Sequence, residues 1–169
     1  MNFDKIRPLF GTLKQSQVDG INTIIEEFNK VHTDKRFLAY ILATVFHETG
    51  KRMQPVKELG GETYLKSKTY YPYYGRDLVQ TTWITNYQKV KNVTGIDVVN
   101  NPQLIGQMPL SATVAVLFMT KGWYTGKKLA DYFNDTKEDW VNARRIINGT
   151  DKASLIAGYG KEFYEALTA

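Results

Sequence analysis

Carboxyl groups near one end of an apolar segment are the residues best suited to chemistry in this chain. Residues 37–50 read FLAYILATVFHETG, so Glu48 follows ten uncharged residues and a histidine. Burial disfavours the charged form of a carboxyl group and raises its pKa. A glutamate that stays protonated near neutral pH can donate a proton to a leaving oxygen. Glu48 is therefore a candidate general acid, although a glutamate at a helix end can equally point into solvent.

Hydrolysis of a glycosidic bond needs a second carboxyl group on the opposite side of that bond. Glu58 and Glu62 follow Glu48 by ten and fourteen residues. Either one could face Glu48 across a cleft, and either could be a solvated loop residue. The spacing does not choose between them.

A metal-dependent reaction is not indicated by these residues. His47 and Glu48 match half of the HExxH zinc motif, but the second histidine is replaced by Lys51. The chain has two histidines and no cysteine, which excludes disulfides and thiolate metal sites. We expect neither a metal nor a cofactor, and we expect His47 to be structural.

Helices must position these groups. Leu38, Ile41, Leu42 and Val45 recur at helical spacing, which predicts a helix over 37–48, buried in the core and ended by Gly50. Further helices are predicted over 16–31, 82–90, 109–121, 127–133, 139–147 and 153–167. The first of these has an approximate capping box at Ser16 and Asp19.

A long irregular segment, residues 51–76, follows the central helix. Loops of this length inside a compact domain are usually functional or disordered. The tyrosines at 70, 71, 73 and 74 favour packing over disorder. The prediction is one mostly α-helical domain over residues 1–169, with a central buried helix, a long active-site loop and no separate wall-binding domain.

Composition narrows the classes of partner. The chain has 22 basic and 17 acidic residues, a net charge of +5, and eleven tyrosines. The basic residues are dispersed, which argues against a nucleic-acid groove, whereas the net charge favours an anionic surface such as a cell wall. Tyrosine and tryptophan faces suit sugar rings. The chain shows neither a signal peptide nor a long apolar run, so we expect synthesis in the cytoplasm and no stable membrane insertion.

Five segments, in order, resemble the family 19 chitinases among the glycoside hydrolases, and in particular their phage endolysin branch. They are SQVDGINTIIEEF at 16–28, HETG with MQPVKE at 47–58, YYGRDLVQTTWITNY at 73–87, GWYTGKKLADYF at 122–133 and WVNARRIINGTDKA at 140–153. The resemblance covers nearly the whole chain. It implies a lysozyme-like fold with a sugar-binding cleft between two lobes.

The resemblance also implies roles for single residues. Glu48 would be the general acid and Glu58, rather than Glu62, the general base. The residues that would position water and sugar are Gln80, Thr82, Asn86 and Asn148, with Tyr74 and Arg76 as further binding candidates. The family reaction inverts the anomeric centre, which implies carboxyl groups about 6.5–9.5 Å apart.

Two departures from the family pattern bear on the site. Asp77 stands where the family usually has glycine, and it could either raise the pKa of neighbouring groups or cap a turn. Plant members also carry a basic residue that pairs with the catalytic glutamate. Arg145 and Lys152 are the candidates for that role here.

Three functions remain open from the sequence. The first is an endolysin that hydrolyses β-1,4 bonds of peptidoglycan glycan strands in the periplasm. It would act as a monomer after a separate membrane-permeabilising protein releases it from the host cytoplasm. The second is a chitinase acting on β-1,4-linked N-acetylglucosamine polymers. The third is an inactive glycan-binding or virion structural protein.

Overall fold

The computed structural model describes all residues from 1 to 169, and it is mostly helical, as the sequence predicts. The α-helices are α1 (Arg7–Phe10), α2 (Gln15–Asn29), α3 (Lys35–Glu48), α4 (Glu62–Lys66), α5 (Ile84–Thr94), α6 (Leu110–Lys121) and α7 (Ala153–Thr168). The 3-10 helices are η1 (Phe3–Lys5), η2 (Pro102–Gly106), η3 (Leu129–Asp131) and η4 (Asn142–Ile146). An isolated bridge between Phe133 and Glu138 is the only β pairing.

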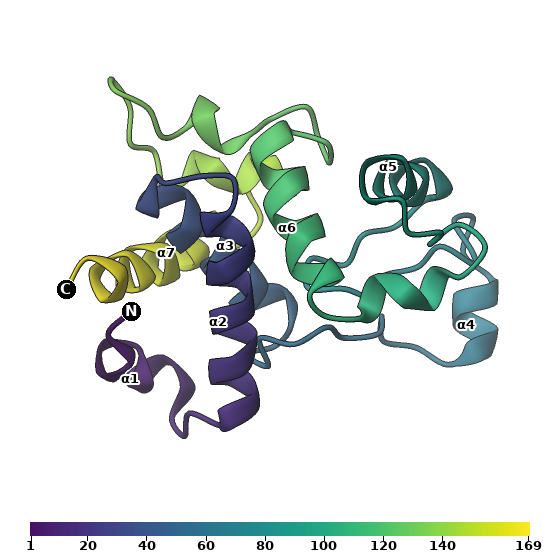
Figure 1. The fold of residues 1–169 in the computed structure, drawn as a ribbon, viewed down its shortest axis with the longest axis horizontal. Coiled ribbons are helices and arrows are strands. Elements are labelled where there is room, and N and C mark those ends of the chain that lie inside the picture. Colours follow the sequence, from purple (N-terminus) through teal and green to yellow (C-terminus); the bar gives the residue numbers. More distant parts are fainter.

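Helix α3 lies at the centre of the fold, as predicted. It starts where the side chain of Asp34 accepts a hydrogen bond from the backbone N–H of Arg36 at 2.9 Å, which satisfies one of the free donors of the first turn. Residues 38–46 are all buried. The most extensive helix contact in the molecule joins α3 to α7, and Figure 1 shows these two helices side by side. A helix enclosed in this way holds its C-terminal residue, Glu48, in a rigid position.

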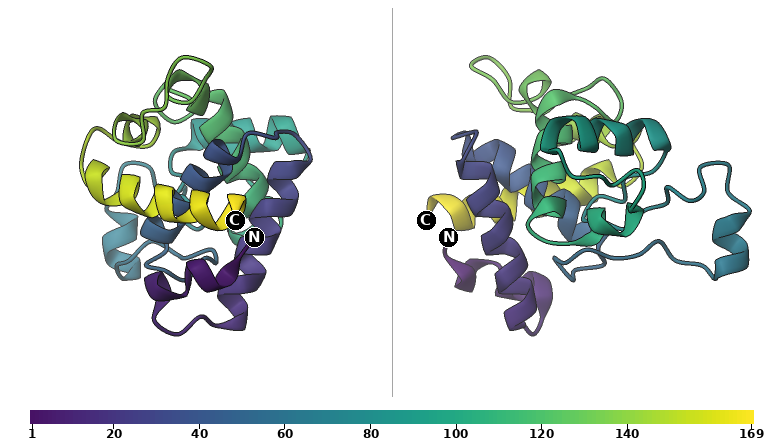
Figure 2. Two further views of the ribbon diagram at one scale, coloured as in Figure 1. Left: turned by 90° about the vertical axis from the view of Figure 1, so that its left-hand side faces the viewer. Right: turned by 45° about the vertical axis from the view of Figure 1, so that its right-hand side comes forward.

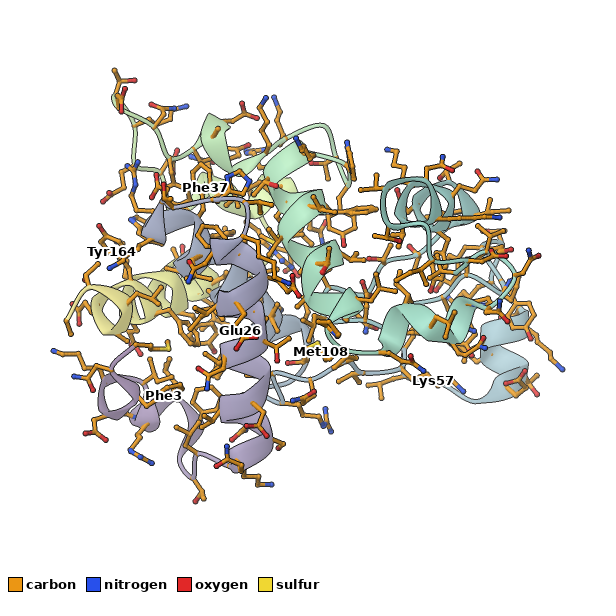
Figure 3. All side chains as sticks on the ribbon, viewed as in Figure 1. Phe3, Glu26, Phe37, Lys57, Met108 and Tyr164 are labelled. Carbon is orange, nitrogen blue, oxygen red and sulfur yellow. The ribbon has the colours of Figure 1, made fainter.

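Two hydrophobic clusters define two lobes. The larger cluster contains residues of α2, α3 and α7, and the smaller one contains residues of α5, η2 and α6. Helix α6 contributes to both, with Ala115 and Met119 in the larger cluster and Val114 and Phe118 in the smaller. Figure 1 shows α6 between α1, α2, α3 and α7 on one side and α4 and α5 on the other. Phe3, Phe37, Met108 and Tyr164, labelled in Figure 3, are partly buried against the larger cluster.

The segment between α3 and α5 is the long loop expected from the sequence, interrupted only by α4. In the right-hand view of Figure 2 it extends away from the body of the molecule, with α4 at its far end. Two of its tyrosines pack as predicted, whereas Tyr71 is 37% exposed. The Tyr73 hydroxyl donates a hydrogen bond to the Val99 carbonyl at 2.9 Å, and Tyr74 is buried.

Several local predictions are wrong. The capping box at Ser16 and Asp19 does not form, because α2 begins one residue earlier. The Gln17 side chain caps it instead, accepting from the Lys14 N–H at 2.7 Å. Trp83 falls within the helix predicted over 82–90, but α5 starts after it and Trp83 is 48% exposed.

The two helices predicted over 127–133 and 139–147 shrink to the short 3-10 turns η3 and η4. Both segments carry apolar residues at helical spacing, but tertiary packing overrides a weak local preference. None of the helices combines the length and apolar composition that a membrane-spanning helix requires.

Candidate active site

Glu48 is the last residue of α3, and its side chain is 20% exposed. The turn that follows is held by Thr49, whose hydroxyl donates to the Val45 carbonyl at 2.7 Å and accepts from the Met53 N–H at 3.0 Å. Lys51 and Met53 have positive φ angles of 72° and 55°, which are unfavourable for residues with side chains. Such backbone strain persists where surrounding contacts hold it, and it clusters at functional sites.

Helix α2 packs closely against the turn that follows Glu48. A Cβ atom added at Gly20 would overlap the carbonyl oxygen of Met53. The Gln17 side chain donates a hydrogen bond to the Lys51 carbonyl at 3.0 Å. These contacts hold the backbone directly after Glu48 against α2.

Arg144 is the basic partner of Glu48. Its Nη1 atom donates to Glu48 Oε1 at 3.2 Å, its Nε donates to the Asp151 carbonyl at 2.9 Å, and its side chain is 4% exposed. The predicted candidates, Arg145 and Lys152, are wrong, because both are exposed and neither makes an ion pair with Glu48. The sequence did contain a signal, since Arg144 lies four residues after the buried Trp140 on the apolar side of the segment.

Glu58 is held by the part of the long loop that follows α4. Its Oε2 accepts from the Tyr70 hydroxyl at 2.5 Å and its Oε1 from the Gly75 N–H at 3.2 Å, and its own N–H donates to the Gly75 carbonyl at 2.7 Å. Burial and the hydrogen bond to Glu58 raise the pKa of Tyr70 to about 12. Tyr70 therefore remains a hydrogen-bond donor at neutral pH.

The two glutamates line one pocket, which has a volume of about 350 Å³. Gln80 also lines this pocket, and it lines a second one of about 230 Å³ together with Thr82 and Asn86. The two pockets are therefore adjacent and share Gln80. Glu62 lies outside them at the start of α4, where its exposed side chain is 3.8 Å from Lys66. Of the two alternatives for the second carboxyl group, the structure brings Glu58 to Glu48.

The other predicted site residues fall into two groups. Gln80 has a φ of 57° and donates to the carbonyls of Val56 at 2.6 Å and Asp77 at 3.1 Å, so it ties the two arms of the loop together. Asn86 donates to the Thr82 carbonyl at 3.0 Å. These residues border the pockets.

Three predicted binding residues lie elsewhere. The Arg76 guanidinium lies 3.5 Å from the centre of the Tyr74 ring and donates to the Pro72 carbonyl at 2.8 Å. Asn148 is exposed, and its side chain makes one hydrogen bond, accepting from the N–H of Gly149. None of Tyr74, Arg76 and Asn148 lines the two pockets. The first two pack the loop, so any role in binding would be indirect.

Asp77 caps a turn, which is the second of its two expected roles. Its side chain is fully buried and accepts from the N–H and from the hydroxyl of Thr81, both at 2.6 Å. The Thr81 hydroxyl also bonds to the Tyr124 hydroxyl at 2.7 Å. Burial raises the pKa of Asp77 from 3.8 to about 6, against the lowering effect of the Thr81 hydrogen bonds. Burial and the charge of Asp77 together raise the pKa of Tyr124 well above its usual value.

Sequence reasoning also missed Tyr124 and Trp83, which border the second pocket beside Gln80. Tyr124 lies in a turn and is partly buried, and nothing in its local sequence indicates that it borders a pocket. Trp83 precedes α5 with a φ of 76° and is 48% exposed, so the helical spacing of this segment does not describe it. No group of three His, Cys, Asp or Glu side chains is arranged to hold a metal ion.

Comparison with known proteins gives relatives of one kind, although no protein-family model matches the chain. An endochitinase of Arabidopsis thaliana is 32% identical over 147 residues, which are 82% of this chain and 52% of that protein. The acidic endochitinase of Dioscorea japonica is 30% identical over 124 residues, which are 68% of this chain and 47% of that protein. The chain thus spans about half the length of these curated relatives.

Solved structures agree on the fold. Chitinase C from Streptomyces griseus superposes with a TM-score of 0.69 at 22% identity, covering 98% of this chain and 76% of that one. A bacterial family 19 chitinase gives a TM-score of 0.63 at 21% identity, covering 97% of this chain and 93% of that one. The sequence relatives identify the chain as chitinase-like, and the solved structures show that it has the fold of the family 19 chitinases.

Proposed function

We propose that this chain hydrolyses β-1,4 glycosidic bonds in a polysaccharide of N-acetylated amino sugars by an inverting acid/base mechanism. The observation that carries the proposal is that Glu48, from the end of α3, and Glu58, from the long loop, line the same pocket. Two carboxyl groups on opposite walls of a cleft are the arrangement that glycosidic hydrolysis needs. The relatives support the same class, since they are named endochitinases.

The contacts of each glutamate suit a different role. Glu48 would protonate the bridging oxygen as the bond to the anomeric carbon breaks. The Arg144 guanidinium, 3.2 Å from its Oε1, would stabilise the carboxylate that this proton transfer leaves behind. Glu58 would take a proton from a water molecule that attacks the anomeric carbon from the opposite face. Hydrogen bonds from Tyr70 and Gly75 hold its orientation.

For the substrate, we propose bacterial peptidoglycan, with an endolysin as the biological role. Arg52 and Lys57 line the pocket of the two glutamates, and Lys57 is labelled in Figure 3 on the loop leading to α4. Neither makes an ion pair within the chain. These charges, and the net charge of +5, suit an anionic wall polymer. Action in the periplasm after release by a membrane-permeabilising protein, as a monomer, belongs to the same proposal.

Chitin is the second candidate substrate. The names of the relatives favour it, and a chitin chain has the same β-1,4 linkage and N-acetyl groups. The two candidates differ in the lactyl group and the peptide stems that only peptidoglycan carries.

Digestion of purified peptidoglycan, with glycol chitin in parallel, tests both candidates. Mass spectrometry should find muropeptides with new sugar reducing ends, and NMR of the first products should show an inverted anomer. Glu48→Gln should slow hydrolysis by at least roughly 10²-fold. Release of peptides alone would contradict any glycosidase function, and an unchanged rate in Glu48→Gln would contradict the assignment of the acid.

A further inference from the structure

A polar pocket opens beside the one that holds the two glutamates. It has a volume of about 270 Å³ and is lined by Lys14, Ser16, Gln17, Arg52 and Gln54. Arg52 also lines the glutamate pocket, so the two are neighbours along the surface. We refer to it as the Lys14–Arg52 pocket. The proposed mechanism does not use it.

The amide side chains of this pocket form hydrogen bonds with the backbone that makes up its walls. Gln54 donates to the Ser16 carbonyl at 2.7 Å, and Gln17 donates to the carbonyl of Lys51 at 3.0 Å. These two bonds join the first turn of α2 to the turn after Glu48. The pocket is therefore formed by fixed backbone rather than by mobile side chains alone.

The two cations of the pocket are free. Lys14 and Arg52 are exposed, and neither has a carboxylate within ion-pair distance. Arg52 has a defined position, because its Nη1 donates to the Thr49 carbonyl at 3.3 Å. The remaining donors of its guanidinium have no partner within the chain. Two free cations in a polar pocket suit a carboxylate ligand.

The position of the pocket beside the glutamate pocket indicates which carboxylate it would bind. A glycan lying across Glu48 and Glu58 would pass beside Arg52. A chitin chain has no charged substituent to place there. A peptidoglycan strand carries a peptide stem on every second sugar, and these stems project sideways and bear free carboxylates.

We propose that the Lys14–Arg52 pocket binds a stem-peptide carboxylate of peptidoglycan and thereby sets the preference of the enzyme for peptidoglycan over neutral glycans. This inference rests on the proposed glycosidase function and names the substrate feature that the same cleft would recognise. The competing explanation is adsorption through the overall positive charge, which would not depend on these two residues in particular.

The test compares intact peptidoglycan with peptidoglycan whose carboxylates have been converted to neutral amides. The quantity measured is the ratio of kcat/KM for the two substrates. The test variant is Lys14→Gln/Arg52→Gln. The matched control is Lys35→Gln/Lys161→Gln, which removes the same charge from two exposed lysines without ion pairs. Lys35 begins α3, about 20 Å from Glu48 at the other end of that helix.

The wild type should prefer intact peptidoglycan about three- to tenfold, as expected for two partly exposed ion pairs. The preference should fall to about one in Lys14→Gln/Arg52→Gln and persist in the control. It should also persist in Lys14→Arg/Arg52→Lys, which keeps both charges. An equal loss of preference in the control variant would overturn the inference in favour of general adsorption.

Failure of the inference can be told apart from failure of the proposed function. If the wild type cleaves both forms of peptidoglycan equally, the pocket is not a carboxylate site but the glycosidase proposal stands. If it cleaves no glycan, the proposed function fails. Sedimentation of the protein with intact and amidated peptidoglycan then tests the pocket alone, and equal binding to both would overturn the inference.

Discussion

The buried carboxyl group of Asp77 provides a quantitative test of the loop that carries the site. Its pKa is raised from 3.8 to about 6 because the group is fully buried. The folded state therefore binds this proton more tightly than the unfolded state does. The stabilisation from the protonated group is fully present below pH 3.8, and it is lost as the pH rises to about 6. A difference of this size corresponds to about 3 kcal/mol.

Replacing Asp77 with asparagine removes this pH dependence. The amide retains an acceptor for the Thr81 N–H and supplies a donor for the Thr81 hydroxyl, which now both bond to the carboxyl group at 2.6 Å. The wild type loses this stabilisation as the pH rises, and the variant does not. The difference in free energy of unfolding, Asp77→Asn minus wild type, should therefore be about 3 kcal/mol higher at pH 8 than at pH 3. Any loss from imperfect hydrogen bonding is the same at every pH and cancels in this comparison.

Urea unfolding at several pH values, followed by tryptophan fluorescence and circular dichroism, measures this difference. Asp139→Asn is a control with the opposite sign, because hydrogen bonds from Asn142 lower the pKa of Asp139. Its relative stability should improve as the pH falls. A stability difference between Asp77→Asn and the wild type that does not vary with pH would refute the buried, raised-pKa carboxyl group.

Three further tests, which use five substitutions, probe the catalytic pocket and the turn that supports it. Glu58→Gln should lower kcat by roughly 10²-fold or more, whereas Glu62→Gln should stay within about twofold, as expected for a residue outside the pocket; the reverse result would assign the base to Glu62. Arg144→Gln should lower the free energy of unfolding by about 2 kcal/mol, because it removes a nearly buried charged hydrogen bond to the acid, and no change in urea unfolding would contradict that contact. Gly20→Ala should destabilise the protein by roughly 1–3 kcal/mol, because the added Cβ overlaps the turn after Glu48. Gly158→Ala has open space around it and should stabilise α7 by roughly 0.5–1 kcal/mol. Equal effects of these two changes on the midpoint of thermal unfolding would contradict the close packing at Gly20.

The sequence by itself determined the elements whose signal is local. The apolar spacing in α3 predicted a buried helix, and a helix was predicted over 109–121, where α6 lies. Such patterns depend only on residues a few positions apart, so they are readable without tertiary information. The position of Glu48 at the edge of the core followed from the same spacing. The choice of Glu58 over Glu62 did not, because it came from the family resemblance.

Tertiary structure alone decided which distant groups meet. Arg144 reaches Glu48 across 96 residues of chain, and the choice between it and Arg145 depends on how η4 packs against α7. Asp77 became a buried cap rather than a third acid in the cleft because Thr81 offers it two donors inside the loop. Burial and long-range pairing depend on how the elements pack. Arg144 and Arg145 are neighbours in the sequence, and the orientation of the short η4 turn decides which of them is buried.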